Sequence, residues 1–114
     1  MFTFEEYSQL ASSTAIYPAT VVDNVVVGCY PFLGLSGEVG EVSEKIKKLI
    51  RDKGGIVDED FLKSLEKELG DVLWYLNAIA KDFGLNLSYI ASKNIEKLQD
   101  RKSRGTIQGS GDNR

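Results

Sequence analysis

The fold is decided by two stretches of sequence, GLSGEVGE at residues 34–41 and EKELGDVLWYL at residues 66–76. Each stretch carries two acidic residues three positions apart, Glu38 with Glu41 and Glu68 with Asp71. On a helix this spacing places both carboxylates on one surface, a turn apart. Four oxygen ligands on two facing helices suit a hard divalent cation. The alternative for these residues is two ordinary solvated acidic faces.

Both acidic stretches lie inside longer helical patterns. Apolar residues recur at alternating spacings of three and four from Pro31 to Lys53, and again from Asp58 to Phe83. Pro31 suits a first helical position, Asp58 suits a helix cap, and glycines follow both patterns. The short connection at residues 54–57 favours antiparallel packing, which brings the two acidic edges together along one side of the helix pair.

The N-terminal part of the chain predicts a short helix followed by an irregular connection. Thr3 and Glu6 have the spacing of a capping box, which starts a helix that reaches about Ser12. Residues 13–30 break the helical period with Pro18 and a cluster of valines. We interpret this segment as an extended connection with a brief hairpin. Its role is either that of a loop covering apolar surface, which is favoured, or that of a binding arm.

The C-terminal part predicts one further helix and a tail. Asn86 or Ser88 caps a helix that reaches about Arg104. The tail at residues 105–114 is rich in glycine and has no periodicity, so we expect it to be flexible. The sequence thus predicts one all-α domain, a bundle of four or five helices over residues 1–104, followed by this tail.

Composition excludes several classes of protein. A chain of 114 residues has room for one core. With one cysteine, Cys29, and no histidine it forms no internal disulfide, zinc cluster or histidine-based triad. No apolar run approaches the roughly 18 residues of a membrane span, and the N-terminus does not resemble a secretion signal. We therefore expect a cytoplasmic protein without a membrane partner.

Charge is distributed unevenly along the chain. Residues 1–92 carry 8 basic and 14 acidic side chains, whereas residues 93–114 carry 6 basic and 3 acidic ones. An acidic body with a basic end suits combined binding of a metal and an anion. A nucleic-acid partner is not expected, because the only basic stretch is short and the body is acidic.

Some residues outside the acidic pairs also suggest a binding site. Asn94, Lys97 and Arg101 form a stripe on the last helix, and such cations neutralise phosphate unless they are merely a solvated basic face. Tyr75 lies on the helix edge of Glu68 and Asp71, within reach of the site.

Glycine and tryptophan positions indicate close approach near the acids. Gly34, Gly37 and Gly40 recur inside a helical pattern, where each costs about 1 kcal/mol relative to alanine. Close approach of a ligand or of another backbone explains them, unless the helix starts only at Ser36. Trp74 lies opposite its helix's apolar centre, so we expect it to meet the first helix, another subunit or a stacked base, with burial favoured.

The ordered set of motifs resembles one known family. E-x-x-E at residues 38–41, E-x-x-D at residues 68–71 and NIEKLQDRKSRG at residues 94–105 resemble the MazG-type all-α nucleoside triphosphate pyrophosphohydrolases. The resemblance covers about residues 30–114. It implies hydrolysis of (deoxy)nucleoside triphosphates to nucleoside monophosphate and pyrophosphate, in a homodimer or homotetramer. It also implies that a metal-activated water attacks the α-phosphorus.

The resemblance also implies site residues. The metal would be Mg²⁺, with Mn²⁺ as a substitute, held by Glu38, Glu41, Glu68 and Asp71. Glu41, or Glu38 as a second catalytic residue, would take the proton of the attacking water. Substrate contacts would come from Asn94, Lys97, Arg101, Tyr75 and Arg114. A dUTP-specific or guanine-preferring enzyme and a non-catalytic helical oligomerisation module are the alternatives.

Overall fold

The computed structural model describes residues 1–114 and contains four helices and one small hairpin. The elements are α1 (Phe4–Ser12), β1 (Val21–Val22), β2 (Val25–Val26), α2 (Tyr30–Lys53), α3 (Glu59–Asp82) and α4 (Leu87–Ser103). The prediction of an all-α fold is confirmed, and each predicted helix is present within a residue or two of its expected ends.

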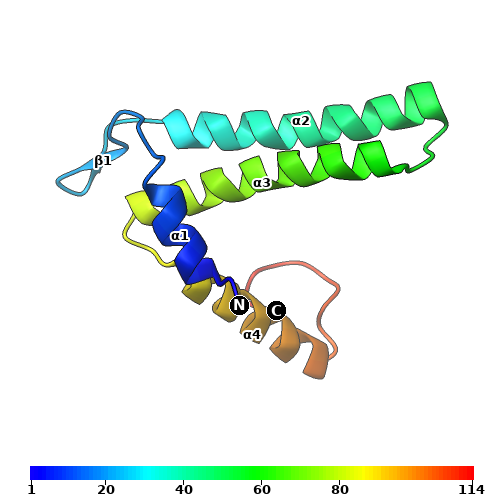
Figure 1. Ribbon diagram of the computed structural model, residues 1–114. Helices are drawn as coiled ribbons and strands as arrows, with labels where there is room; N and C mark the ends of the chain where they lie inside the picture. The colour runs from blue at the N-terminus through cyan, green and yellow to red at the C-terminus, as the bar shows by residue number, and fades with distance from the viewer.

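Helices α2 and α3 form a long antiparallel pair, which is the most extensive contact in the molecule (Figure 1). Gly54 ends α2 with a φ of 60°, in the left-handed region that favours glycine. Asp58 then starts α3 by accepting a hydrogen bond at Oδ1 from the Phe61 amide at 2.8 Å. These local signals produce the antiparallel turn that the sequence predicts.

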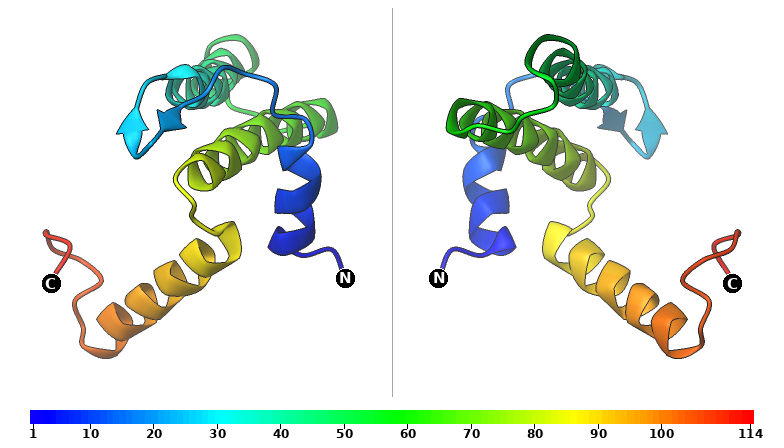
Figure 2. Two further views of the ribbon diagram at one scale, coloured as in Figure 1. Left: turned by 90° about the vertical axis from the view of Figure 1, so that its left-hand side faces the viewer. Right: turned by 90° about the vertical axis from the view of Figure 1, so that its right-hand side faces the viewer.

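Helix α1 packs against α3 and α4 (Figure 2). Its predicted capping box is confirmed: the Glu6 amide donates to Thr3 Oγ1 at 3.1 Å, and the Thr3 amide donates to Glu6 Oε2 at 2.8 Å. A helix of nine residues is marginal alone, so its packing on α3 and α4 is what keeps it in place.

The segment between α1 and α2 contains the brief hairpin. Strands β1 and β2 are antiparallel, and Asp23 and Asn24 between them have φ of 50° and 63°. Two left-handed residues make the turn that matches the natural twist of a hairpin. The segment is tied to the end of α3, because Tyr17 Oη and Thr20 Oγ1 both donate to Asp82 Oδ2, at 2.7 and 2.8 Å.

Helix α4 departs from the other helices and points away from the α2–α3 pair (Figures 1 and 2). The tail that follows contains no regular structure and folds back toward α4. Arg101 Nη2 donates to the Asp112 carbonyl at 2.6 Å, and the guanidinium of Arg114 donates to three carbonyls of the tail itself. The flexibility expected of this tail stays a prediction.

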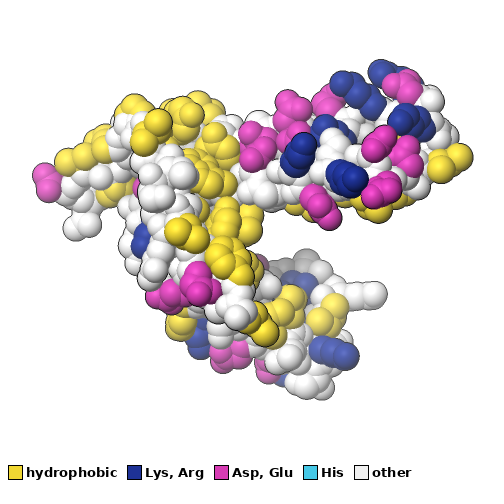
Figure 3. All heavy atoms as spheres, viewed as in Figure 1, with side chains coloured by type: hydrophobic (Ala, Val, Ile, Leu, Met, Phe, Trp, Pro, Cys, Tyr) yellow, Lys and Arg dark blue, Asp and Glu magenta, His cyan; other side chains and the backbone are white.

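The single chain is open rather than closely packed. Only 10 of its 114 residues are buried, and its radius of gyration is 17.3 Å, whereas about 13 Å is typical for a compact domain of this size. Apolar side chains gather over α1 and the neighbouring hairpin end, and charged ones cover the far end of α2 and α3 (Figure 3). None of the helices combines the length and apolar character needed to cross a membrane.

Candidate metal centre

Three carboxylates meet where α2 and α3 run side by side. Glu38 of α2 and Glu68 and Asp71 of α3 each offer an oxygen, and these oxygens all lie within 4.8 Å of one another. Glu38 and Glu68 are half-buried and Asp71 is exposed. The antiparallel packing of the two long helices thus brings together three of the four acids that the sequence singles out.

The electrostatics of this acidic cluster, Glu38 with Glu68 and Asp71, fit a bound cation. Burial raises the pKa of Glu38, and the charge of Asp71 and a hydrogen bond with Glu68 raise it further. Lys45 lies 3.5 Å from Glu68 and balances part of the charge. Carboxylate oxygens are the ligands that hard divalent cations prefer, so the donor set matches a cation of that class.

Glu41 lies outside the acidic cluster. It is exposed on α2, and its charge is still close enough to contribute to the raised pKa of Glu38. This agrees with the helical geometry, because Glu41 lies three residues beyond Glu38 and is turned further from the α3 seam.

Tyr75 packs across Gly34, beside the acidic cluster. A side chain at Gly34 would collide with the Tyr75 ring, so the group that approaches this glycine closely is an aromatic side chain and not the ligand or backbone that the sequence predicts. Because α2 begins at Tyr30, the alternative that the helix starts at Ser36 is wrong. Burial raises the pKa of Tyr75, and the neighbouring Tyr30 and the charges of Glu38 and Asp71 raise it further. Gly37 and Gly40 face open space.

An open cavity of about 370 Å³ adjoins the acids. Its lining residues are Thr14, Glu38, Asp71, Trp74 and Tyr75. Trp74 is half-buried, and its Nε1 donates to Thr14 Oγ1 at 2.8 Å. The tryptophan therefore bonds to the segment just after α1, beyond the end of the first helix that the sequence predicts as one of its possible partners.

The basic residues predicted on the last helix are not part of this cavity. Asn94 and Lys97 are exposed on α4. Arg101 is only 5% exposed, with its guanidinium bonded to the tail, and Arg114 is bonded to the tail as well. Within one chain, these residues and the acidic cluster thus lie on different parts of the molecule (Figure 1).

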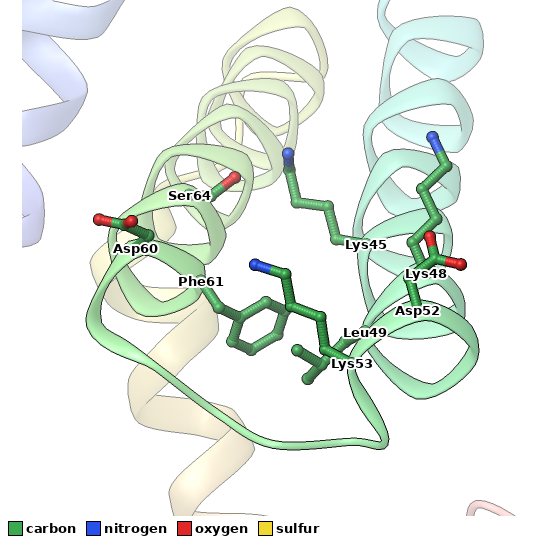
Figure 4. A pocket seen from close by; sticks show the side chains of 8 residues that line it. All are labelled: Lys45, Lys48, Leu49, Asp52, Lys53, Asp60, Phe61 and Ser64. Atoms are coloured by element: carbon green, nitrogen blue, oxygen red, sulfur yellow. The ribbon is translucent and has the colours of Figure 1, made fainter.

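A lysine on α2 is the residue that sequence reasoning missed. Lys45 pairs with Glu68 and lines a cavity of about 280 Å³ farther along the α2–α3 pair. Figure 4 shows Lys45 and Lys53 extending from α2 toward α3, with Phe61 beneath them. The available signal was spacing, because Lys45 follows Glu38 by seven residues, which is two helical turns.

The chain is similar to a known protein family and to a phage protein. The MazG nucleotide pyrophosphohydrolase domain matches residues 32–106, a range that contains α3, α4 and all of α2 except its first two residues. The Gene 37 protein of Mycobacterium phage L5 is 47% identical over 109 residues, covering 95% of this chain and 96% of the phage protein. No solved structure matches significantly. The acidic cluster and the matched range together show that this chain belongs to the MazG nucleotide pyrophosphohydrolase family.

Proposed function

We propose that this protein hydrolyses nucleoside triphosphates to nucleoside monophosphate and pyrophosphate in a reaction that depends on Mg²⁺. The observation that carries the proposal is the convergence of Glu38, Glu68 and Asp71 within 4.8 Å, in a chain that belongs to a nucleotide pyrophosphohydrolase family. Such an acidic cluster beside an open cavity suits binding of a metal together with a phosphate chain.

The chain's own carboxylates would hold the cation. Glu38, Glu68 and Asp71 supply three oxygens, and Glu41 lies nearby on the exposed side of α2. A bound Mg²⁺ would offset phosphate charge and make a bound water more acidic. Tyr75 borders the same cavity and is placed to contact the nucleotide.

Glu41 is the residue that we assign to accept the proton of the attacking water. It lies outside the tight acidic cluster but near enough for its charge to act on Glu38. A general base needs such a position, within reach of the water but not fully engaged in holding the metal. We expect Glu41→Gln to lower turnover about a hundredfold or more while Mg²⁺ binding persists. Glu38→Gln should abolish both, which calorimetry together with a turnover assay checks.

Phosphate contacts would come from two places. Lys45 already lies beside Glu68 and can pair with the phosphate chain instead. Asn94, Lys97, Arg101 and Arg114 lie on or near α4, away from the acids of the same chain. A second copy of the chain is therefore needed to bring these residues to the site, and a homodimer or homotetramer supplies it.

The decisive experiment is product analysis. The protein is incubated with a panel of deoxynucleoside triphosphates and Mg²⁺, and the phosphorus products are separated. Pyrophosphate and the monophosphate are expected in equal amounts. Orthophosphate as the only phosphorus product besides the diphosphate would contradict the proposal, because it places cleavage at a different bond.

The exposed apolar surface of the single chain favours a second candidate, a helical oligomerisation module without catalysis. In that case the acids are only solvated. Calorimetric titration with Mg²⁺ or Mn²⁺ separates the two, because a solvated acidic face shows no saturable site whereas a metal centre does.

A further inference from the structure

A second cavity lies between α1, the segment that follows it and the C-terminal part of α3. It measures about 200 Å³ and is lined by Ala11, Ser12, Ala15, Tyr17, Trp74, Asn77, Ala78, Lys81 and Asp82. Trp74 also lines the cavity next to the acidic cluster, so the two cavities share this side chain as a wall.

This α1–α3 cavity contains a buried polar group that the protein leaves without a partner. Asn77 is 1% exposed, and its Oδ1 accepts no hydrogen bond from any protein donor. Leaving such an acceptor unpaired costs free energy, and buried amides are normally satisfied. An N–H donor of a ligand held in the cavity would satisfy Asn77.

The rest of the cavity suits a flat ring. Three alanines leave the space open, and two of them, Ala11 and Ala78, are buried. Tyr17 and Trp74 pack edge to face with ring centroids 6.2 Å apart and give the cavity an aromatic side. A cavity of about 150 Å³ is enough for a benzene ring, so this volume accommodates a nucleobase but not a whole nucleotide.

Asp82 adds a second acceptor to the polar end. Its Oδ2 is fixed by hydrogen bonds from Tyr17 and Thr20. An amide can turn around and offer its nitrogen, but an ionised carboxylate only accepts. Two acceptors at one end of a cavity therefore favour a ligand edge that carries hydrogen-bond donors.

We propose that the α1–α3 cavity is the base subsite of this protein, and that Asn77 with Asp82 selects bases that carry an exocyclic amino group. The proposal rests on the proposed hydrolysis of nucleoside triphosphates. In this arrangement the phosphates of the substrate lie beside the acidic cluster, and its nucleobase lies in the α1–α3 cavity, which shares Trp74 with the cavity at the acids. An oxo group in place of the amino group would face the Asp82 carboxylate, an acceptor that cannot become a donor by turning, and this lowers kcat/KM on the order of tenfold.

The test compares bases that differ at the amino group. Pyrophosphate release is measured for dCTP against dUTP and for dATP against dITP. The wild type should favour the amino-bearing member of each pair. In Asn77→Leu this preference should shrink toward one, with the aminated substrates losing the activity. Ser12→Ala is the matched control, because it lines the same cavity but its hydroxyl is already bonded to the Ser8 carbonyl.

A binding measurement makes the test independent of catalysis. Trp74 is the only tryptophan in the chain and lines the cavity, so its fluorescence reports on occupancy. We expect dCMP to quench it at lower concentration than dUMP, and Asn77→Leu to remove the difference.

Failure of the inference and failure of the proposed function look different. Pyrophosphate release without base preference, a preference for dUTP, or an equal loss on all substrates in Asn77→Leu would overturn the base subsite alone. No turnover of any triphosphate, together with selective quenching by dCMP, would overturn the hydrolysis and support the subsite.

Discussion

Glu38 has an unfavourable environment for its charge in the acidic cluster, and it is also one of the oxygen donors that would bind a metal. Its pKa is raised in the folded state by burial and by neighbouring acids. The folded chain therefore holds a proton on Glu38 at a pH where the unfolded chain has released it. The contribution of Glu38 to the free energy of unfolding therefore falls as the pH rises from 4.5, the ordinary pKa of a glutamate, through the raised pKa of the folded state.

The first prediction follows from this sign. With a chelator present at neutral pH, Glu38→Gln should raise the melting temperature, because the charge that burial and then the neighbouring acids disfavour is gone. The gain should vanish below pH 4.5, where the carboxyl is protonated in both states. Added Mg²⁺ should stabilise the wild type but not the variant. Glu66→Gln, an exposed acid of α3 outside the acidic cluster, is the control and should change neither quantity. A melting temperature of Glu38→Gln below that of the wild type would contradict this account.

Gly34 and Gly37 lie one turn apart on the same helix in opposite surroundings. The Tyr75 ring occupies the space where a side chain of Gly34 would be, whereas nothing lies within 4 Å of a side chain at Gly37. The same substitution should therefore have opposite effects at the two positions.

The second prediction uses this pair. Gly34→Ala should destabilise the fold by about 1–3 kcal/mol, because displacing Tyr75 outweighs the better helix propensity of alanine. Gly37→Ala should stabilise it by about 0.5–1 kcal/mol through propensity alone. Urea unfolding measures both. Equal effects of the two variants would mean that Tyr75 moves aside freely.

At the scale of elements, the segment after α1 fastens the N-terminal part of the chain to α3. Thr14 accepts the hydrogen bond of Trp74, and Tyr17 and Thr20 donate to Asp82 at the end of α3. These bonds, together with the edge-to-face contact of Tyr17 with Trp74, connect the segment to the helix that carries two of the clustered acids.

The third prediction tests that connection. Thr14→Val keeps the side-chain shape but removes the acceptor of the Trp74 N–H, and should cost about 1 kcal/mol. Thr14→Ser keeps the hydroxyl and should cost less. Because Trp74 is the only tryptophan, its fluorescence in the native state should change in the valine variant and not in the serine variant.

At the scale of the whole molecule, the open shape of one chain is the dominant fact. Few residues are buried, α4 points away from α2 and α3, and many large apolar side chains are exposed. Acids and α4 cations are separated within a chain, so a symmetric assembly would both cover apolar surface and unite the two halves of a site.

The fourth prediction is complementation between inactive variants. Glu38→Gln lacks the acidic cluster's central carboxylate, and Lys97→Ala lacks a cation of α4. Each should be inactive alone, and mixing them with subunit exchange should restore activity, because a mixed dimer pairs intact acids of one chain with intact Lys97 of the other. If each site were built within one chain, mixing would restore nothing. Sedimentation at micromolar concentration should show a dimer or tetramer, and a monomer would contradict the assembly.

The sequence by itself determined the elements and the acids. Capping at Thr3, Asp58 and Asn86 and the alternating apolar spacing are local signals, and they place all four helices. The same periodicity ranks Glu38 and Glu68 nearer the helix seam than Glu41 and Asp71, as their burial in the structure also does.

Only the tertiary structure decided which residues meet. Lys45 forms an ion pair with Glu68, Trp74 donates a hydrogen bond to Thr14, and Arg101 donates one to the tail. Each interaction links segments that are separated in the sequence or that meet because the chain reverses. Periodicity reports which way a side chain faces on its own element. It carries no information about the rotation and separation of two packed elements. Rotation and separation determine that Asn77 is buried without a partner and how close the acids lie to one another.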